Sequence, residues 1–418
     1  MKLHWQILIA LVFAVIIGPL TPWLDKNAGI HLIPYYEFFG ALFLNALKMI
    51  IVPLIISSII VGISSIKQDG SFARMGSKTV LYYAVTTTLA ILVGLVLVMT
   101  FQPGLIDGQP AKDMLGLHES TAEVTEKVAD AHASDIASIF LRMIPPNIVE
   151  AAAQGQMLGL IFFSLLFGFF ITKLESHHKN SLQHFFEATF EVMMKMTDLI
   201  MRFAPIGVFA LVAKIVASSG IEVFIPLAKF FFVVLSALAI HMFIVMPLLL
   251  KFAGRVRPVM HFRAMLPALL TAFSTSSSAA TLPVTLDCLQ ENAGVSNKTS
   301  SFVVPLGATI NMDGTALYEC VAALFIAQAY GLHLGFEEQF TVVVLALLTS
   351  VGVAGIPAAS LVAITIILGA MGLPLEGIGL ILAVDRVLDM CRTSVNIFGD
   401  SCGAVIIARS EGETTKLV

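Results

Sequence analysis

Long apolar stretches fill most of the first 250 residues of this chain and limit what it can fold into. A helix that crosses a bilayer needs about 20 mainly apolar residues. Runs that meet this requirement occupy 5–23, 38–66, 77–101, 157–174, 186–217 and 223–250. Only 12% of all residues are charged, whereas about a quarter are charged in a soluble domain. The sequence therefore predicts an all-α, polytopic membrane protein.

The N-terminal run could be mistaken for a signal peptide. It is too long, however, and it ends at Pro-Leu-Thr-Pro-Trp without a small-residue cleavage site, so we expect a first transmembrane helix. The net charge of −4 and the lack of a basic patch argue against nucleic acid as a partner. Apolar stretches without metal-type spacing surround all four cysteines, and we expect packed free thiols at Cys288, Cys320, Cys391 and Cys402.

The distribution of lysine and arginine predicts the orientation in the membrane. Loops on the side of the N-terminus carry Lys67, Arg74, Lys78, Lys173, Lys179, Lys251, Arg255, Arg257 and Arg263. The opposite side carries few basic residues, such as Lys26, Lys112 and Lys127. The positive-inside rule then places both termini in the cytoplasm and the acidic loop 102–146 outside the cell membrane.

Two later segments are each predicted to form a re-entrant hairpin. Residues 265–286 have two apolar arms of about ten residues around Ser274–Ser278, and neither arm can cross a bilayer alone. Polar backbone is not tolerated in lipid, which favours a hairpin buried in protein over a single serine-rich span. Residues 341–371 repeat the pattern with a turn at 352–357, where the alternative is one kinked span.

Each predicted hairpin precedes an apolar segment that polar residues interrupt. Segment 300–332 contains Asn311-Met312-Asp313-Gly314-Thr315, and segment 378–408 carries several charges. A hairpin followed by an interrupted helix, twice over, indicates an internal repeat of the inverted kind that builds transporter sites. Asn311–Thr315 could free backbone carbonyls to line a cavity, or could be a simple kink. The serine tip could receive a carboxylate at helix N-termini, or could only pack.

The last segment carries a stripe of polar residues. At about 100° per residue, a sector of about 100° contains Asp385, Asp389, Arg392, Thr393, Asn396 and Asp400, with Arg386 outside it. Ionisable groups inside a membrane are costly and usually functional. Three carboxylates against one arginine leave surplus negative charge, which an ammonium group or Na⁺ would balance. The guanidinium of Arg392 suits a carboxylate. A purely structural salt-bridge network is the alternative.

Four motifs resemble the glutamate transporter family, the dicarboxylate/amino acid:cation symporters. They are Ser276-Ser277-Ser278 through Thr281-Leu282-Pro283, Asn311-Met312-Asp313-Gly314-Thr315, Ala354-Gly355-Ile356-Pro357, and Asp389 through Asp400. The resemblance covers nearly the whole chain. It implies eight transmembrane helices plus two re-entrant hairpins with inverted repeats, in a homotrimer with an elevator-type transport domain on a trimerisation scaffold.

The same resemblance implies a domain organisation. Scaffold helices would occupy 1–75 and 147–220, helix three of the transport domain 76–101, and an extracellular acidic loop 102–146. Helix six would occupy 221–255. The transport core, with hairpin 1, helix 7, hairpin 2 and helix 8, would occupy 256–418.

Substrate-binding residues also follow from the resemblance. Asp389 would bind the substrate amine, Arg392 the side-chain carboxylate, and Ser278, Thr315 and Asn396 the α-carboxylate. The pocket would be completed by Ser277, Ile356, Ser360 and Thr393. Three sodium sites are implied: one from Asp400, Asn311 and the carbonyls of Gly307 and Asn396; one from Asp313, Tyr83, Thr86, Thr87 and Asn311; one from Met312 and the carbonyls of Thr309, Ser350, Val351 and Val353.

Glu319 resembles the glutamate that carries the co-transported proton in animal relatives, although it could instead be a buried structural glutamate. The leading hypothesis is sodium-coupled symport of aspartate or glutamate, with no organic cofactor. A C4-dicarboxylate carrier would bring no amine to Asp389, and a neutral amino acid carrier would leave Arg392 unpaired. An anion-conducting channel is a further alternative. An intramembrane enzyme is disfavoured because no histidine accompanies the serine tip in a recognisable motif.

Overall fold

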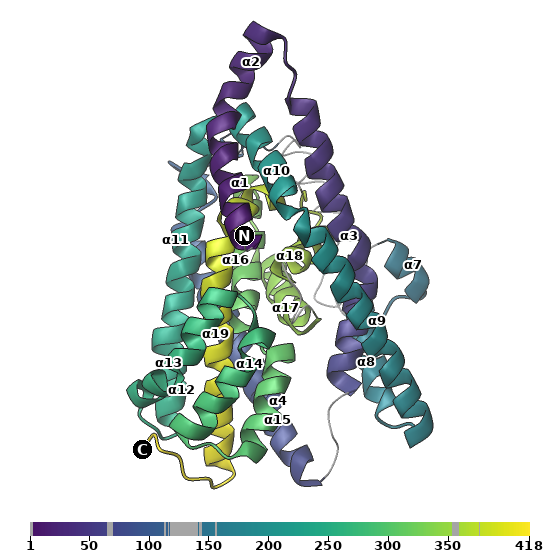
Figure 1. The fold of residues 1–418 in the computed structure, drawn as a ribbon, viewed down its shortest axis with the longest axis vertical. Coiled ribbons are helices and arrows are strands. Elements are labelled where there is room, and N and C mark those ends of the chain that lie inside the picture. The colour runs from purple at the N-terminus through teal and green to yellow at the C-terminus, as the bar shows by residue number, and fades with distance from the viewer. Residues whose placement is uncertain are drawn as a thin grey trace.

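Helices form almost all of the regular structure in the computed structural model (Figure 1). It describes residues 3–64, 70–112, 114–115, 117, 141, 144–154, 157–352, 359–375 and 377–418. The predicted all-α membrane fold is confirmed. The helices pack in two groups, which we define by their central members as the α3 group and the α19 group.

The α3 group contains most of the N-terminal half. Its elements are α1 (Leu3–Ile17), η1 (Gly18–Leu20), α2 (Thr21–Ala28), α3 (Ile33–Ser64), α7 (Ile148–Ala153), α8 (Met157–Ile171), α9 (Ser176–Arg202) and α10 (Ala204–Ser219). Helix α3 packs against α8, α9 and α10, and α1 packs against α10. The apolar run 186–217 is divided between two helices, because α9 and α10 meet at 54°. Pro205 lies in the first turn of α10, where a proline is well tolerated but cannot continue the preceding helix.

The α19 group contains α4 (Gly70–Phe101) and most of the C-terminal half. Its other elements are η2 (Ile221–Val223), α11 (Phe224–Ile240), η3 (His241–Val245), α12 (Met246–Phe252), α13 (Pro258–Thr275), α14 (Ser278–Asp287), η4 (Cys288–Ala293), α15 (Asn297–Ile310), α16 (Asp313–Ala329), α17 (Phe336–Gly352), α18 (Ala359–Ala370) and α19 (Gly377–Ser410). Helix α19 runs through the middle of this group, against α13, α15, α16, α11 and α4. Residues 392–408 are all buried. The polar stripe therefore belongs to a central helix rather than to one with a lipid-facing back.

Length and apolar composition identify the helices that can cross a bilayer. Among the described residues these are Ile9–Ala28, Arg74–Phe101, Phe224–Phe252 and Asn297–Ala329, with the bent pair α9–α10 as a fifth. Helix α19 has 34 residues, a length of about 51 Å that exceeds the ~30 Å hydrocarbon core. Its charged residues make α19 more polar than the apolar spans named above. Such residues are tolerated inside a membrane when protein surrounds them.

The first re-entrant hairpin is present, and the single-span alternative is wrong. Helix α13 ends at Thr275, Ser276 adopts a left-handed conformation with φ 51°, and α14 begins at Ser278. Ser277 caps α14 by accepting a hydrogen bond from the Ala280 amide (3.2 Å). Because α13 and α14 pack against each other, the chain turns back at the serine run.

The second pair of short helices, α17 and α18, also pack against each other. This packing favours the hairpin over one kinked span. The turn between them, at 353–358, lies outside the described residues.

The loop 102–146 contains a short β-ribbon that we did not predict. Strands β1 (Leu105–Ile106) and β2 (Gln109–Pro110) pair antiparallel across Asp107-Gly108. Both turn residues have positive φ, 52° and 77°. An Asp-Gly pair favours this tight turn, so the local sequence held the signal. Residues 118–140 of the loop lie outside the described residues.

The last residues of the chain, 411–417, tie together the ends of several helices, and we call them the C-terminal clasp. Glu411 pairs with Arg74 (2.6 Å) and Lys78 (2.5 Å) of α4. Glu413 accepts hydrogen bonds from the Ser296 amide (3.0 Å) and the Thr299 hydroxyl (2.6 Å) at the start of α15. The carboxylate thus satisfies donors at a helix N-terminus, where negative charge is favoured.

Glu413→Gln is expected to lower the melting temperature by a few degrees at neutral pH and to have no effect in acid. Partial burial raises the pKa of Glu413, but the hydrogen bonds from Thr299 and Ser296 outweigh it and lower the pKa below its ordinary value. Such a group stabilises the fold above its unfolded pKa of about 4.3, and the contribution is lost as the pH falls through the folded pKa. Melting curves from pH 7 to about pH 3 test this. Glu187→Gln, at an exposed position of α9, is the control, and a pH-independent difference would contradict the prediction.

Candidate functional site

Arg392 is the centre of a buried charge cluster on α19. Its guanidinium Nη2 lies 2.9 Å from Asp389 Oδ1 and 3.0 Å from Asp385 Oδ1. The guanidinium also lies over the ring of Tyr318 from α16, 3.9 Å from the ring centroid. Arg386 Nη1 lies 3.3 Å from the second oxygen of Asp389. We call these five residues the Arg392 cluster.

The Arg392 cluster retains binding capacity. The Arg392 side chain is only 1% exposed, whereas that of Asp389 is 28% exposed. Two guanidinium nitrogens, Nε and Nη1, have no hydrogen-bond partner among the described residues. A buried donor without a partner is costly. A carboxylate that accepted from both nitrogens would satisfy them with the planar geometry that arginine favours.

The charge count that we made from the sequence needs correction. Arg386 was placed outside the polar stripe, yet its side chain reaches Asp389 three residues ahead. The Arg392 cluster therefore holds two arginines and two aspartates and is balanced. The surplus of negative charge is instead located at Asp400 and Asp313, both fully buried.

Asn396 joins α19 to the break between α15 and α16. Its Oδ1 accepts from the Gly314 amide (2.8 Å), and its Nδ2 donates to the Thr315 hydroxyl (3.2 Å). Helix α15 ends at Ile310 and α16 begins at Asp313. The Asn311–Thr315 motif thus breaks a helix inside the protein, where a side chain replaces the missing backbone partner.

Asp400 lies beside the same break. Its Oδ1 accepts from Asn311 Nδ2 (2.9 Å), while Oδ2 is buried without a hydrogen-bond partner in the described part of the chain. Gly307 permits this approach, because a Cβ there would lie 2.6 Å from the Tyr83 hydroxyl and would collide with Asp400. Tyr83 donates to the Val303 carbonyl (2.8 Å). A buried carboxylate oxygen without a hydrogen-bond partner is a suitable ligand for a hard cation.

A second carboxylate, Asp313, is held by hydroxyls from α4. Thr87 donates to Asp313 Oδ1 (2.7 Å), and Thr86 is 3.3 Å from the same oxygen. Both threonines also lie 3.4 Å from Asn311 Oδ1. The structure therefore brings together four of the five residues predicted for this sodium site, with Tyr83 bonded to the nearby Val303 carbonyl instead.

His241 is not among the site residues predicted from the sequence, although the structure places it in contact with this group. Its Nε2 lies 3.2 Å from Asp313 Oδ2, and both side chains are fully buried. It is the first residue of the π-helical segment η3, and such segments often occur at functional sites. An ionisable residue in the middle of the apolar run 223–250 was the available signal.

The residues predicted for the third sodium site are only partly described. Met312 is buried, and α15, which carries Thr309, packs against α17, which carries Ser350 and Val351. Val353 lies outside the described residues.

Glu319 on α16 is fully buried, and Thr349 from α17 donates to its Oε2 (2.8 Å). Its Oε1 has no partner among the described residues. The carboxyl group thus links α16 to the first arm of the second hairpin.

The remaining predicted substrate residues lie on three elements. Ser278 is buried and Ser277 half-buried at the start of α14, which contacts α19. Ser360 is buried near the start of α18. Thr393 is buried on α19 and donates to the Asp389 carbonyl (2.9 Å). Ile356 lies outside the described residues.

Comparison with known proteins gives the family. Residues 3–410 match the model of the sodium:dicarboxylate symporter family. This chain belongs to that family. The proton/sodium-glutamate symport protein of Geobacillus stearothermophilus is 36% identical over 411 residues, which cover 98% of this chain and 95% of the relative. The proton/glutamate-aspartate symporter of Escherichia coli K12 is 36% identical over 410 residues, covering 98% and 93%. Human excitatory amino acid transporter 3 is 36% identical over 464 residues, covering 98% and 86%.

Family membership fixes the general class of this symporter. The family is made up of transporters, so the chain is a multi-pass membrane transporter and not an enzyme. Coupling to sodium or protons and transport of acidic amino acids are the properties of its relatives. The buried carboxylates, the partly satisfied guanidinium and the broken helix are the features of this chain on which a more specific proposal can rest.

Proposed function

We propose that this symporter carries L-aspartate or L-glutamate into the cell together with Na⁺. The observation that carries the proposal is the Arg392 cluster, which offers the partly exposed carboxylate of Asp389 and two guanidinium nitrogens that have no hydrogen-bond partner among the described residues. The substrate ammonium would bind Asp389, and its side-chain carboxylate would bind Arg392. A C4-dicarboxylate would leave Asp389 without an amine, and a neutral amino acid would leave the free guanidinium nitrogens unsatisfied.

The α-carboxylate of the substrate would bind at the Asn311–Thr315 break. Asn396 and Thr315 are already hydrogen-bonded to each other there (3.2 Å). Ser278, at the N-terminal end of α14, would add a hydroxyl and helix amide groups, which favour an anion. Ser277, Thr393, Ser360 and Ile356 would complete the pocket.

Sodium would bind at the two buried carboxylates. Asp400 with Asn311 and the carbonyls of Gly307 and Asn396 would form one site. Asp313 with Thr86, Thr87, Asn311 and Tyr83 would form the second. Oxygen donors of this kind suit hard cations such as Na⁺. Met312 and the carbonyls of Thr309, Ser350, Val351 and Val353 would form the third.

The two helix groups would have different roles in transport. In this proposal the α19 group, including α4, is the moving transport domain of an elevator, and the α3 group is the scaffold of a homotrimer. Both termini would lie in the cytoplasm, with the α4–β1 end of the protein outside. Cross-linking in native membranes tests the homotrimer. The accessibility of introduced cysteines from either side of the membrane tests the position of the termini.

Glu319→Gln is expected to remove the pH dependence of uptake while leaving uptake itself in place. Glu319 is buried, and its Oε1 has no hydrogen-bond partner among the residues that the structure describes. A neutral amide of the same shape would keep the Thr349 contact without exchanging a proton. Initial uptake rates from about pH 5 to pH 8 measure the effect. Thr349→Val, which removes the contact but not the carboxyl group, is the matched control. An unchanged pH profile in Glu319→Gln would assign this residue a structural role.

Uptake by purified protein in liposomes tests the proposed function as a whole. Radiolabelled aspartate, glutamate, succinate and alanine are supplied separately, with an inward Na⁺ gradient, an inward proton gradient or neither. We expect concentrative, saturable uptake of the acidic amino acids with the Na⁺ gradient. Uptake of succinate alone, or non-saturable anion flux without accumulation, would refute the proposal in favour of a dicarboxylate carrier or a channel.

A further inference from the structure

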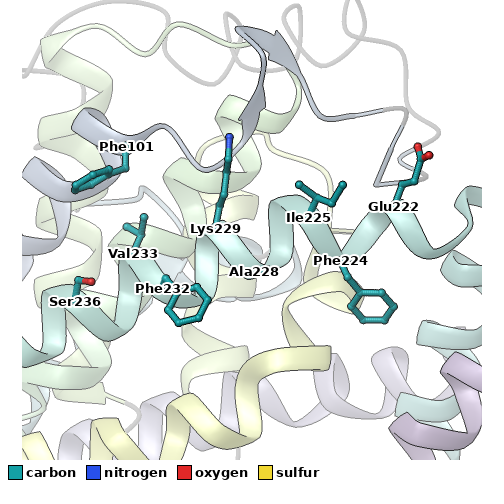
Figure 2. Close-up of a pocket in the computed structure, with 9 residues that line it drawn as sticks. All are labelled: Phe101, Glu222, Phe224, Ile225, Ala228, Lys229, Phe232, Val233 and Ser236. Carbon is teal, nitrogen blue, oxygen red and sulfur yellow. The ribbon is translucent and has the colours of Figure 1, made fainter.

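The ends of α4 and α11 border an open groove on the outside of the α19 group, which we call the α4–α11 groove. Among the described residues it has a volume of about 840 Å³ and is lined by Phe101, Glu222, Phe224, Ile225, Ala228, Lys229, Phe232, Val233 and Ser236 (Figure 2). Ala228 and Ser236 are exposed small residues of this lining, and we call them the floor of the groove.

The walls of the groove are apolar and exposed. Phe101 is 60% exposed, Ile225 49% and Phe232 62%. On a soluble protein such a patch would mark an interaction surface. The span Phe224–Phe252 is long and apolar enough to cross a membrane, so this surface meets acyl chains.

The length of the groove along α11 is close to the thickness of one bilayer leaflet. Phe101 ends α4 and Phe224 begins α11, so the groove opens at the ends of both helices. Ser236 lies twelve residues beyond Phe224, which is about 18 Å along a helix. Half of the hydrocarbon core is about 15 Å thick. One extended acyl chain can therefore lie along the groove from the headgroup level to the middle of the bilayer.

The mouth of the groove carries one charge of each sign. Lys229 and Glu222 extend to the same side of α11, toward the β1–β2 ribbon (Figure 2). Lys229 Nζ donates to the Leu105 carbonyl (3.3 Å), as expected for a lysine that directs its ammonium toward the interface. Seven residues separate the two side chains, which is about 10 Å along the helix. Lys229 is the deeper of the two.

This order of charges corresponds to the headgroup of phosphatidylethanolamine. In that lipid the phosphate is next to the glycerol and the primary ammonium is at the outer end. A phosphate at Lys229 would form a charge-assisted hydrogen bond, and so would an ammonium at Glu222. Phosphatidylglycerol offers no cation to Glu222, and the quaternary amine of phosphatidylcholine has no N–H to donate.

We propose that the α4–α11 groove is a binding site for phosphatidylethanolamine, with one acyl chain over Ala228, the phosphate at Lys229 and the ammonium at Glu222. The proposal is independent of the substrate that the protein carries. Binding at this position would hold the end of α4 against the start of α11.

Native mass spectrometry of the purified full chain tests the proposal by titration with phosphatidylethanolamine, phosphatidylglycerol and phosphatidylcholine of identical acyl chains. We expect one phosphatidylethanolamine to bind per chain, at least about tenfold more tightly than either other lipid, a difference of ~1.4 kcal/mol. Lys229→Ala should remove that binding. Glu222→Gln should remove the preference over phosphatidylcholine but retain phosphate-dependent binding.

Two further variants distinguish lipid binding in the groove from non-specific lipid binding elsewhere on the protein. Ala228→Trp fills the exposed floor without changing any charge and should abolish the bound lipid. Phe252→Trp, at an exposed position on the opposite end of the same span, should bind as the wild type does. Equal retention of all three lipids by the wild type, unchanged binding by Ala228→Trp, or a lipid-free dimer that buries the groove would overturn the proposal.

Discussion

Replacing Arg392 with alanine is expected to reduce aspartate and glutamate uptake at least about a hundredfold and to leave uptake of a neutral amino acid such as alanine measurable. The guanidinium is almost completely buried and is paired with Asp389 and Asp385, while two of its nitrogens have no hydrogen-bond partner in the described part of the chain. Removing one member of a buried charge pair typically costs about 2–5 kcal/mol, which corresponds to a factor of about 30 to 5,000 and includes the expected loss. Competitive uptake of labelled acidic and neutral amino acids by the same liposomes measures it.

A loss of uptake could also come from misfolding, because the substitution leaves two buried carboxylates without their partner. Arg392→Gln is therefore compared, since it keeps a neutral donor in the same space. Arg409→Ala is the matched control, on the same helix but bonded to the Glu413 carbonyl in the C-terminal clasp. Normal aspartate uptake by Arg392→Ala would show that this side chain does not bind the substrate.

Asp400→Asn is expected to raise the sodium concentration for half-maximal uptake by about tenfold or more, ~1.4 kcal/mol. Asp400 is fully buried, and its Oδ2 has no hydrogen-bond partner within the described ranges. A bound Na⁺ would neutralise that oxygen, and an amide of the same shape would supply no negative charge. Uptake rates measured over a wide sodium range, at constant ionic strength, give the shift.

The exposed Asp287 at the end of α14 provides the matched control. Asp287→Asn should leave the sodium dependence unchanged. Thermal melting of Asp400→Asn with and without sodium gives a second readout that does not depend on transport, because an ion that binds only the folded state raises its stability. Wild-type sodium dependence in both measurements would exclude Asp400 as a sodium ligand.

Much of the fold could be predicted from the length of apolar runs, because the bilayer sets the length of a spanning helix. The serine run at 274–278 predicted a reversal, since its two arms are too short to cross. The bend between α9 and α10 was missed, although Pro205 marks it. The polar composition of the loop 102–146 does not indicate the β1–β2 ribbon, and only the local Asp-Gly pair favours its turn.

The candidate site shows that angular positions around a helix do not identify every contact between side chains. Angular spacing identified the stripe from Asp385 to Asp400, but it treats each residue as a point on the helix surface. Arg386 lies outside the stripe and still contacts Asp389, because a long side chain reaches its neighbour three residues ahead. Contacts between distant segments, such as His241 with Asp313, depend on tertiary packing and do not appear in any local pattern.

The boundary between the two helix groups has a mechanical consequence. None of the hydrogen bonds and ion pairs described above joins the α3 group to the α19 group. Where α10 meets α19, Gly379 faces the aliphatic side chains of Leu211 and Ile215. Dispersion contacts between aliphatic groups are individually weak and have no preferred direction. In the proposed elevator, two bodies that meet through such contacts would slide past one another in small steps, exchanging one set of aliphatic neighbours for an equivalent one.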